Sequence, residues 1–235
     1  ERILIGMNDA RDPIYFDPEA SRNPSENYNL MVTGNSGSGK TQLIKYLIWK
    51  FREQGRNVLV FDFKGDYTDR DHFCTKSSLG QVFVYDNGLP FNPLFPRIDI
   101  DKVTKEKRIN IGQHIFGIAS VLNKRDRGSH RQEAAIREAI KIAFREKGIP
   151  DSGAFDYEPS MEFPDLQEIG ETLRISNIGA YEKIEEMFSL GLFRPEYSKD
   201  SFETLLNKSL VLDFSSIQKK EIKNTLAELI VLSAH

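Results

Sequence analysis

The sequence predicts an α/β fold in which a parallel sheet is interrupted by a mainly helical insertion. Two short apolar runs, typical of buried strands, flank an amphipathic helix between residues 29 and 61. A glycine-rich loop joins the first run to the helix, as in phosphate-binding βαβ units. Residues 101–190 then show helical periodicity, and a further apolar run follows at residues 209–213. Strand, helix and strand in this order favour parallel strands with a right-handed crossover.

The composition is that of an ordinary soluble globular protein. The 235 residues contain 32 lysines and arginines against 35 aspartates and glutamates, a net charge of -3, and 39% of them are hydrophobic. These values exclude a disordered chain and a globally basic nucleic-acid coat protein. No apolar run approaches the roughly 20 residues of a membrane span, so we expect no membrane segment. Cys74 is the single cysteine, which excludes an intrachain disulfide and is compatible with a cytoplasmic location.

The first hundred residues contain most of the predicted strands. The apolar run before the glycine-rich loop ends at Gly34, as a buried strand should. Apolar residues recur at helical spacing from Leu43 to Phe51, and Gly55 supplies a stop signal. Short apolar runs predict strands at residues 3–5, 14–16, 29–33, 58–61 and 82–85.

The middle of the chain is predicted to be almost wholly helical from residue 101 to residue 190. Its clearest helix begins at Ser129, where Gln132 completes a capping box. Residues 149–163 are rich in Gly, Pro, Ser and Asp, which predicts an exposed loop.

A strand at residues 209–213 and a closing helix complete the predicted elements. We expect residues 1–100 and 201–235 to form the core of the fold, which contains the glycine-rich loop. Residues 101–200 would then be a mainly helical insertion within the same domain, and the whole chain stays within single-domain size limits.

Residues 34–41 match the phosphate-binding pattern G-x-x-x-x-G-K-[ST] at every fixed position. Glycines let the backbone curl so that successive N–H groups point at phosphate oxygens, and the following helix adds its N-terminal dipole. Lys40 can reach the β- and γ-phosphates in a catalytic role, and the Thr41 hydroxyl can ligate Mg²⁺. We therefore predict a site for ATP and Mg²⁺. Its nucleotide-binding residues are Gly34, Asn35, Ser36, Gly37, Ser38, Gly39, Lys40 and Thr41.

Two acidic side chains, Asp62 and Asp66, follow the predicted strand at residues 58–61. The end of a neighbouring parallel strand lies at the edge of the sheet where ligands bind. We expect at least one of the pair to approach the Mg²⁺ ion or its waters and to take part in catalysis. The alternative is a polar turn with Asp66 exposed. Asp213, at the end of a later strand, is a further candidate for the acid that faces the metal.

A GTPase-like switch is an alternative that two short motifs suggest. Asp62-x-x-Gly65 imitates one guanine-nucleotide motif, and residues 123–126 imitate the base-reading N-K-x-D. The interval from Lys40 to Asp62 is filled by a helix and a strand, which leaves no room for a switch loop. The N-K-x-D motif should also follow a buried strand, whereas residues 111–122 show helical spacing.

Several ordered features of the chain resemble the HerA/FtsK-type DNA-translocating ATPases, which include the conjugative coupling motors. The resemblance spans nearly the whole chain. The order of the motifs along the chain is more specific than any single motif. The features are the Ile5-Gly6 turn, a strand at residues 13–17, the glycine-rich loop, the D-F-K-G-D-Y segment from Asp62, Asn92-Pro93-Leu94, Gln132 and residues 210–215.

The resemblance implies a RecA-like P-loop NTPase core and an ATP-driven translocase or helicase motor. It also implies a hexameric ring around double-stranded DNA, with arginines donated across subunit interfaces. It leaves open whether a partner nuclease acts with the motor, and in which pathway.

The chain departs from that family at its acidic strand, whose Asp-Glu end should align the attacking water. Phe214 and Ser215 follow Asp213 where a glutamate is needed. The sequence also begins at Glu1 without a methionine, so we expect a part of a longer protein that stops before its catalytic glutamate. Such a chain should bind ATP but hydrolyse it slowly, since this catalysis rests on positioning and electrostatics.

A basic cluster between two predicted helices provides the candidates for DNA contact: Lys124, Arg125, Arg127 and Arg131, with His130 among them. These side chains could bind phosphates in the pore of a ring. The alternative is a solvated helix–helix loop. A function of another class also stays open, a noncatalytic ATP-binding assembly module in which nucleotide only fixes a protein interface.

Overall fold

The computed structural model describes residues 2–18, 29–69, 72–101, 103–124, 128–194 and 207–234. The chain has the predicted α/β fold, with helices and a parallel pair of strands. It divides into two compact units. The first comprises Glu1–Val82 and Asn207–Asp213, and the second comprises Phe83–Leu206 and Phe214–His235.

A three-stranded sheet with the order β3-β8-β4 forms the centre of the first unit. β3 (Leu59–Asp62) and β8 (Leu210–Asp213) run parallel, with Asp62 opposite Asp213. β4 spans Gly80–Phe83. The prediction of a strand over residues 82–85 was therefore displaced, because the single helical turn α3 (Val84–Asn87) begins directly after β4.

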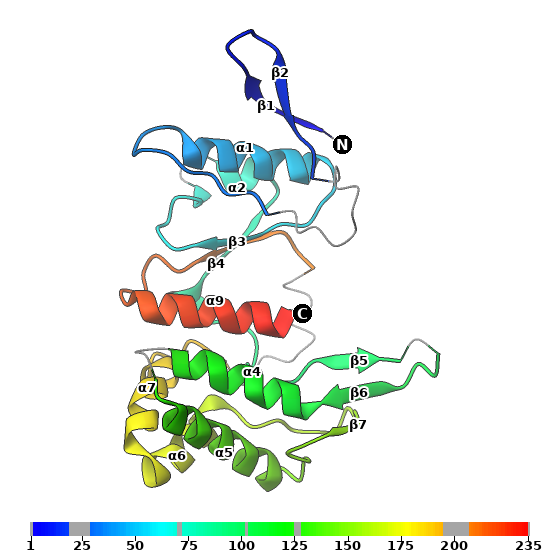
Figure 1. The fold of residues 1–235 in the computed structure, drawn as a ribbon, viewed down its shortest axis with the longest axis vertical. Coiled ribbons are helices and arrows are strands. Elements are labelled where there is room, and N and C mark those ends of the chain that lie inside the picture. The colour runs from blue at the N-terminus through cyan, green and yellow to red at the C-terminus, as the bar shows by residue number, and fades with distance from the viewer. Residues whose placement is uncertain are drawn as a thin grey trace. The chain divides into compact units, whose positions relative to one another are not determined.

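Two helices, α1 (Lys40–Glu53) and α2 (Phe73–Lys76), cover one face of this sheet (Figure 1). Val211 of the central strand is completely buried, as expected for a strand that is covered by helices. The hydrophobic core of the unit consists of Ile48, Val60, Phe73, Cys74, Leu79 and Val211.

Residues 29–33 do not form the predicted strand before the glycine-rich loop. Leu30 is 48% exposed and Met31 is 85% exposed. No described strand pairs with this run, and an apolar run forms a strand only where a neighbour satisfies its backbone groups. The predicted N-terminal strands do form, as the antiparallel pair β1 (Ile3–Met7) and β2 (Pro13–Phe16).

The second unit is built mainly from helices, as the apolar periodicity predicts. Neighbouring helices α4 and α5 bury Ile118, Ile136, Ile140 and Phe144 completely. The long helices are α4 (Ile111–Lys124), α5 (His130–Glu146), α6 (Leu166–Ser176), α7 (Ile178–Ser189) and α9 (Lys220–Ala234).

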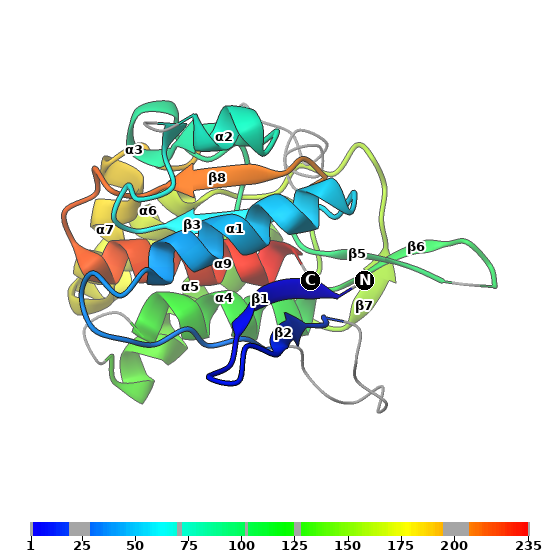
Figure 2. The ribbon, with the colours of Figure 1, turned by 90° about the horizontal axis from the view of Figure 1, so that it is seen from above.

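A small antiparallel sheet corrects the prediction that residues 101–190 are almost wholly helical. Its strands are β5 (Ile98–Ile100), β6 (Lys107–Asn110) and β7 (Ala154–Asp156), in that order. β5 and β6 form an arm that extends from the helices of their own unit (Figure 2). Pairing with both neighbours buries Ile109 completely, although Lys107 and Arg108 precede it in the sequence.

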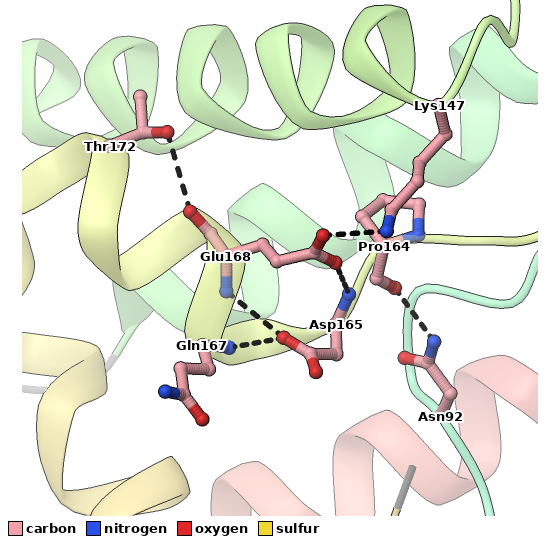
Figure 3. A network of polar contacts seen from close by, with 7 residues as sticks. All are labelled: Asn92, Lys147, Pro164, Asp165, Gln167, Glu168 and Thr172. Atoms are coloured by element: carbon pink, nitrogen blue, oxygen red, sulfur yellow. Dashed lines mark hydrogen bonds and ion pairs between the residues drawn. The ribbon is translucent and has the colours of Figure 1, made fainter.

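Two capping boxes fix helix starts in the second unit. The predicted capping box is confirmed. The backbone N–H of Gln132 donates to Ser129 Oγ over 3.2 Å, and the backbone N–H of Ser129 donates to Gln132 Oε1 over 3.0 Å. A second box joins Asp165 and Glu168 at the start of α6 (Figure 3).

The α6 capping box is part of a wider polar network in the second unit (Figure 3). Lys147 forms an ion pair with Glu168 over 2.7 Å, and the hydrogen bond to Glu168 raises the pKa of Lys147. Asn92 Nδ2 donates to the Pro164 carbonyl oxygen over 2.7 Å. The network therefore ties the end of α5 and the turn at Asn92 to the start of α6.

Candidate nucleotide-binding site

Residues 34–41 form a tight loop that leads directly into α1. The Ser38 amide donates to the Asn35 carbonyl over 3.2 Å, and the first helical bond runs from the Leu43 amide to the Gly39 carbonyl over 2.9 Å. Gly39 has a φ of 88°, in the left-handed region that favours glycine. A Cβ on Gly34 would lie 2.7 Å from Ser38 Oγ, so a side chain at this position would require the Ser38 hydroxyl to move.

The Lys40 side chain folds back over the start of this loop. Its Nζ donates to the Gly34 carbonyl over 2.8 Å and to the Asn35 carbonyl over 2.6 Å. An ammonium has three donors, so these bonds leave one donor for a further acceptor. The loop thus holds a positive charge in place beside its own backbone.

The start of α1 lacks the groups that normally satisfy a helix N-terminus. No side chain caps it, and its first turn contains no acidic residue. The first amides of a helix have no intrahelical acceptor and carry the positive end of the dipole. Thr41 is half-buried at the second helical position. Uncapped amides, a fixed ammonium and a hydroxyl at one loop are a donor set that suits a phosphate group with its metal ion.

Asp62 organises the turn that follows β3. Its Oδ1 accepts the amides of Lys64, Gly65 and Asp66 over 3.1, 2.8 and 3.1 Å, and its Oδ2 accepts the Tyr67 amide over 2.8 Å. The side chain is 1% exposed, so these bonds replace the hydration of a buried carboxylate. The structure gives Asp62 a role in shaping the turn, and its catalytic role stays a prediction.

The other two acidic candidates differ in environment. Asp213 is 6% exposed and lies opposite Asp62, so the parallel pair brings these residues together at the carboxyl end of the sheet. Asp66 is exposed on the turn. Burial raises the pKa of Tyr67, and the charges of Asp62 and Asp66 raise it further.

The predicted DNA-contact residues are only partly described. Lys124 is exposed but forms an ion pair with Glu228 over 2.8 Å. Arg131 is exposed in the first turn of α5. Arg125 and Arg127 lie outside the described residues.

The structure does not support the GTPase-like alternative, in which the N-K-x-D motif that begins at Asn123 would bind a guanine base. Asn123 lies within α4, as the helical spacing predicts, and is 6% exposed. Its Nδ2 donates to the Ser129 carbonyl over 3.3 Å. A buried amide near a helix end does not present the base-reading edge that the motif requires after a strand.

Metal clusters and membrane spans are both missing from the described part of the chain. No three His, Cys, Asp or Glu side chains there come together as metal ligands. No helix over the same residues combines the length and the apolar character that crossing a membrane requires.

A groove beside α1 was not predicted. It has a volume of about 550 Å³ and is lined by Gln42, Lys45, Tyr46, Trp49, Phe73, Lys76 and Ser77. One wall of the groove is the face of α1 opposite its apolar stripe, which the sequence pattern could have indicated. The other wall comes from α2, and the sequence pattern does not show that α2 lies beside α1.

Comparison with known proteins finds similarity over part of the chain. Residues 21–80 match the family described as type IV secretion-system coupling protein DNA-binding domain. Protein TraC of Escherichia coli (strain K12) is 37% identical over 82 residues, which are 35% of this chain and 9% of TraC. The match over residues 21–80 supports the resemblance to coupling motors. The broader assignment to the HerA/FtsK type stays a prediction.

The fold as a whole has a counterpart among solved structures. VirB4 of Thermoanaerobacter pseudethanolicus superposes with a TM-score of 0.67 at 18% identity, over 99% of this chain and 62% of that one. The chain therefore spans less than two thirds of each of these relatives. At this identity the match establishes the shared α/β fold.

Proposed function

We propose that this chain is the ATP-binding part of an ATP-driven motor that acts on DNA. The observation that carries the proposal is the Lys40 ammonium, held on the Gly34 and Asn35 carbonyls next to the uncapped start of α1. This loop lies within residues 21–80, which match the coupling-protein family. The chemistry therefore supports nucleotide binding, and the family match supports a motor with DNA as its substrate.

The loop residues have separate tasks in this proposal. The backbone amides of residues 34–41 bind the phosphates, the remaining Lys40 donor neutralises their charge, and the Thr41 hydroxyl ligates Mg²⁺. Bound Mg²⁺ supplies charge neutralisation at the terminal phosphates. Asp66 and Asp213 are the acidic groups that we assign to the metal or its waters. Asp62 holds the turn that contains Asp66 through its four bonds to backbone amides.

The finer assignment follows the resemblance stated above. We propose a HerA/FtsK-type translocase that works in the cytoplasm as a hexameric ring on double-stranded DNA, with nucleotide biasing the subunit interface. Arg131 and the neighbouring basic residues are the proposed phosphate contacts. Lys124 is a weaker candidate, because Glu228 already balances its charge.

A competition experiment tests the nucleotide assignment. A fluorescent ATP analogue is bound to the chain with Mg²⁺, and unlabelled ATP or GTP is titrated against it. The proposal predicts displacement by ATP, loss of analogue binding in Lys40→Ala and slow hydrolysis that Lys40→Ala abolishes. Preferential displacement by GTP would instead support the switch alternative. Analogue binding that is unchanged in Lys40→Ala would contradict the site itself.

A further inference from the structure

The groove along α1 is a second candidate binding site in the first unit. Gln42, Lys45, Tyr46 and Trp49 occupy positions i, i+3, i+4 and i+7 and share one face of the helix. From Gln42 to Trp49 this face runs about 10 Å along the axis. The opposite wall is formed by α2, through Phe73, Lys76 and Ser77.

Aromatic rings form the apolar part of the groove. Phe73 is 8% exposed and belongs to the core, whereas Trp49 is 39% exposed. The rings of Tyr46 and Trp49 meet edge to face, with centroids 6.1 Å apart at an interplanar angle of 61°. The groove therefore presents fixed aromatic surface to solvent beside a buried ring.

Positive charge accompanies these rings. Lys45 Nζ lies 5.3 Å from the centroid of Phe73, and Lys50 Nζ lies 4.3 Å from that of Trp49. Lys76 lines the other wall and is exposed. None of the described lining residues is acidic, and the nearby Glu53 is engaged with Lys50 over 2.7 Å. The surface thus combines aromatic faces with cations.

We propose that this groove binds single-stranded nucleic acid, with bases stacked on Trp49 and Tyr46 and phosphates paired with Lys45 and Lys76. Aromatic platforms in a positive groove bind single strands with little sequence preference, because every base has a π-face. A duplex keeps those faces stacked inside the helix. An acidic peptide would satisfy the lysines but offers no such series of flat faces. The inference rests on DNA being the substrate in the proposed function, and all lining residues fall within residues 21–80.

The test uses the full chain and a fluorescein-labelled oligothymidylate of about 12 nucleotides, within the range of known single-strand sites. Anisotropy reports binding, and quenching of Trp49, the only tryptophan, reports contact by unlabelled oligonucleotide. We expect Trp49→Ala to weaken binding about fivefold or more, and Trp49→Phe to retain most of it. Lys45→Gln and Lys76→Gln should each reduce the salt slope by about 0.7. Lys220→Gln, on α9, is the matched control and should change neither quantity.

Three results would overturn the inference. The first is an oligonucleotide affinity and salt slope that none of the groove variants changes. The second is equal competition by duplex DNA, which would exclude a single-strand site. The third is polyglutamate quenching Trp49 where oligothymidylate does not, which would assign the groove to an acidic protein partner.

Lys40→Ala separates this inference from the proposed function. This variant should lose ATP binding and keep oligothymidylate binding. A parent chain that binds oligothymidylate but no ATP would contradict the proposed function alone.

Discussion

The substitution Asp62→Asn tests whether this carboxylate shapes the turn after β3. Asparagine has nearly the same shape but keeps only one acceptor oxygen. That oxygen can serve the three amides that Oδ1 accepts in the parent chain. The new NH₂ group then faces the Tyr67 amide at the position of Oδ2, which accepts it over 2.8 Å. A donor would meet a donor in a buried site.

The expected cost follows from that single lost bond. A hydrogen bond to a charged group contributes about 1.5–3 kcal/mol, and a buried amide without an acceptor costs about 1–3 kcal/mol. Asp62 is 1% exposed, so water does not restore the bond. We therefore expect Asp62→Asn to lower the free energy of unfolding by about 3 kcal/mol.

Urea unfolding followed by tryptophan fluorescence is the suitable assay. Trp49 is the only tryptophan and lies in the same unit as Asp62, so its signal reports the affected part of the chain. Hydrogen exchange of the peptide containing residues 64–67 should also accelerate. These readouts do not depend on activity.

Asp66→Asn is the matched control, because Asp66 is exposed and its side chain accepts none of the four bonds. We expect it to change the free energy of unfolding by less than about 0.5 kcal/mol. Replacing a residue that serves function at the expense of stability often makes the fold more stable. A free energy of unfolding that is unchanged or higher in Asp62→Asn would therefore refute the structural role of Asp62.

Three further predictions concern other parts of the chain. Ser129→Ala removes the α5 capping box and should cost about 1 kcal/mol in urea unfolding followed by circular dichroism, and an unchanged midpoint would contradict this. Burial lowers the pKa of His114 from 6.5 to about 4, so the unfolded chain binds more protons between these values. Stability should therefore fall by up to about 3 kcal/mol as the pH drops from 6.5 to 4, and His114→Gln should remove this part of the pH dependence. Burial also raises the pKa of Cys74, so iodoacetamide should modify the native chain roughly tenfold more slowly than the urea-unfolded chain, and equal rates would contradict a buried thiol.

Elements with strong local patterns could be predicted from the sequence. The stripe from Leu43 to Phe51 predicts α1, and the Ser129–Gln132 pair predicts the start of α5. The glycine spacing of residues 34–41 predicts a loop that enters a helix, which the structure shows. Each of these features depends on residues within a few turns of one another.

Features that depend on distant partners could not be predicted. Residues 29–33 have the apolar composition of a strand, but no described strand pairs with them. β6 forms because Ile98 and Phe155 flank Ile109, which no local period reveals. In the same way, the groove requires α2 to lie beside Trp49.

The four bonds to Asp62 are a case between these two. An aspartate at the start of an Asp-Phe-Lys-Gly segment is typical of a turn in which the side chain accepts nearby amides. The sequence therefore indicates a polar turn, which is the alternative given for Asp62 and Asp66 above. The burial of Asp62, however, depends on β8, which lies far along the chain. The sequence therefore predicts the turn but not its protection from water.

Isothermal titration calorimetry with Mg·ATP tests the central claim most directly. The loop geometry predicts saturable binding heat for the full chain at millimolar nucleotide or below. Lys40→Ala should lose this heat, because it removes the ammonium that Gly34 and Asn35 hold in place. Lys220→Ala should keep it. No heat from the folded parent chain, or equal heat from Lys40→Ala, would contradict the claim that residues 34–41 bind a triphosphate.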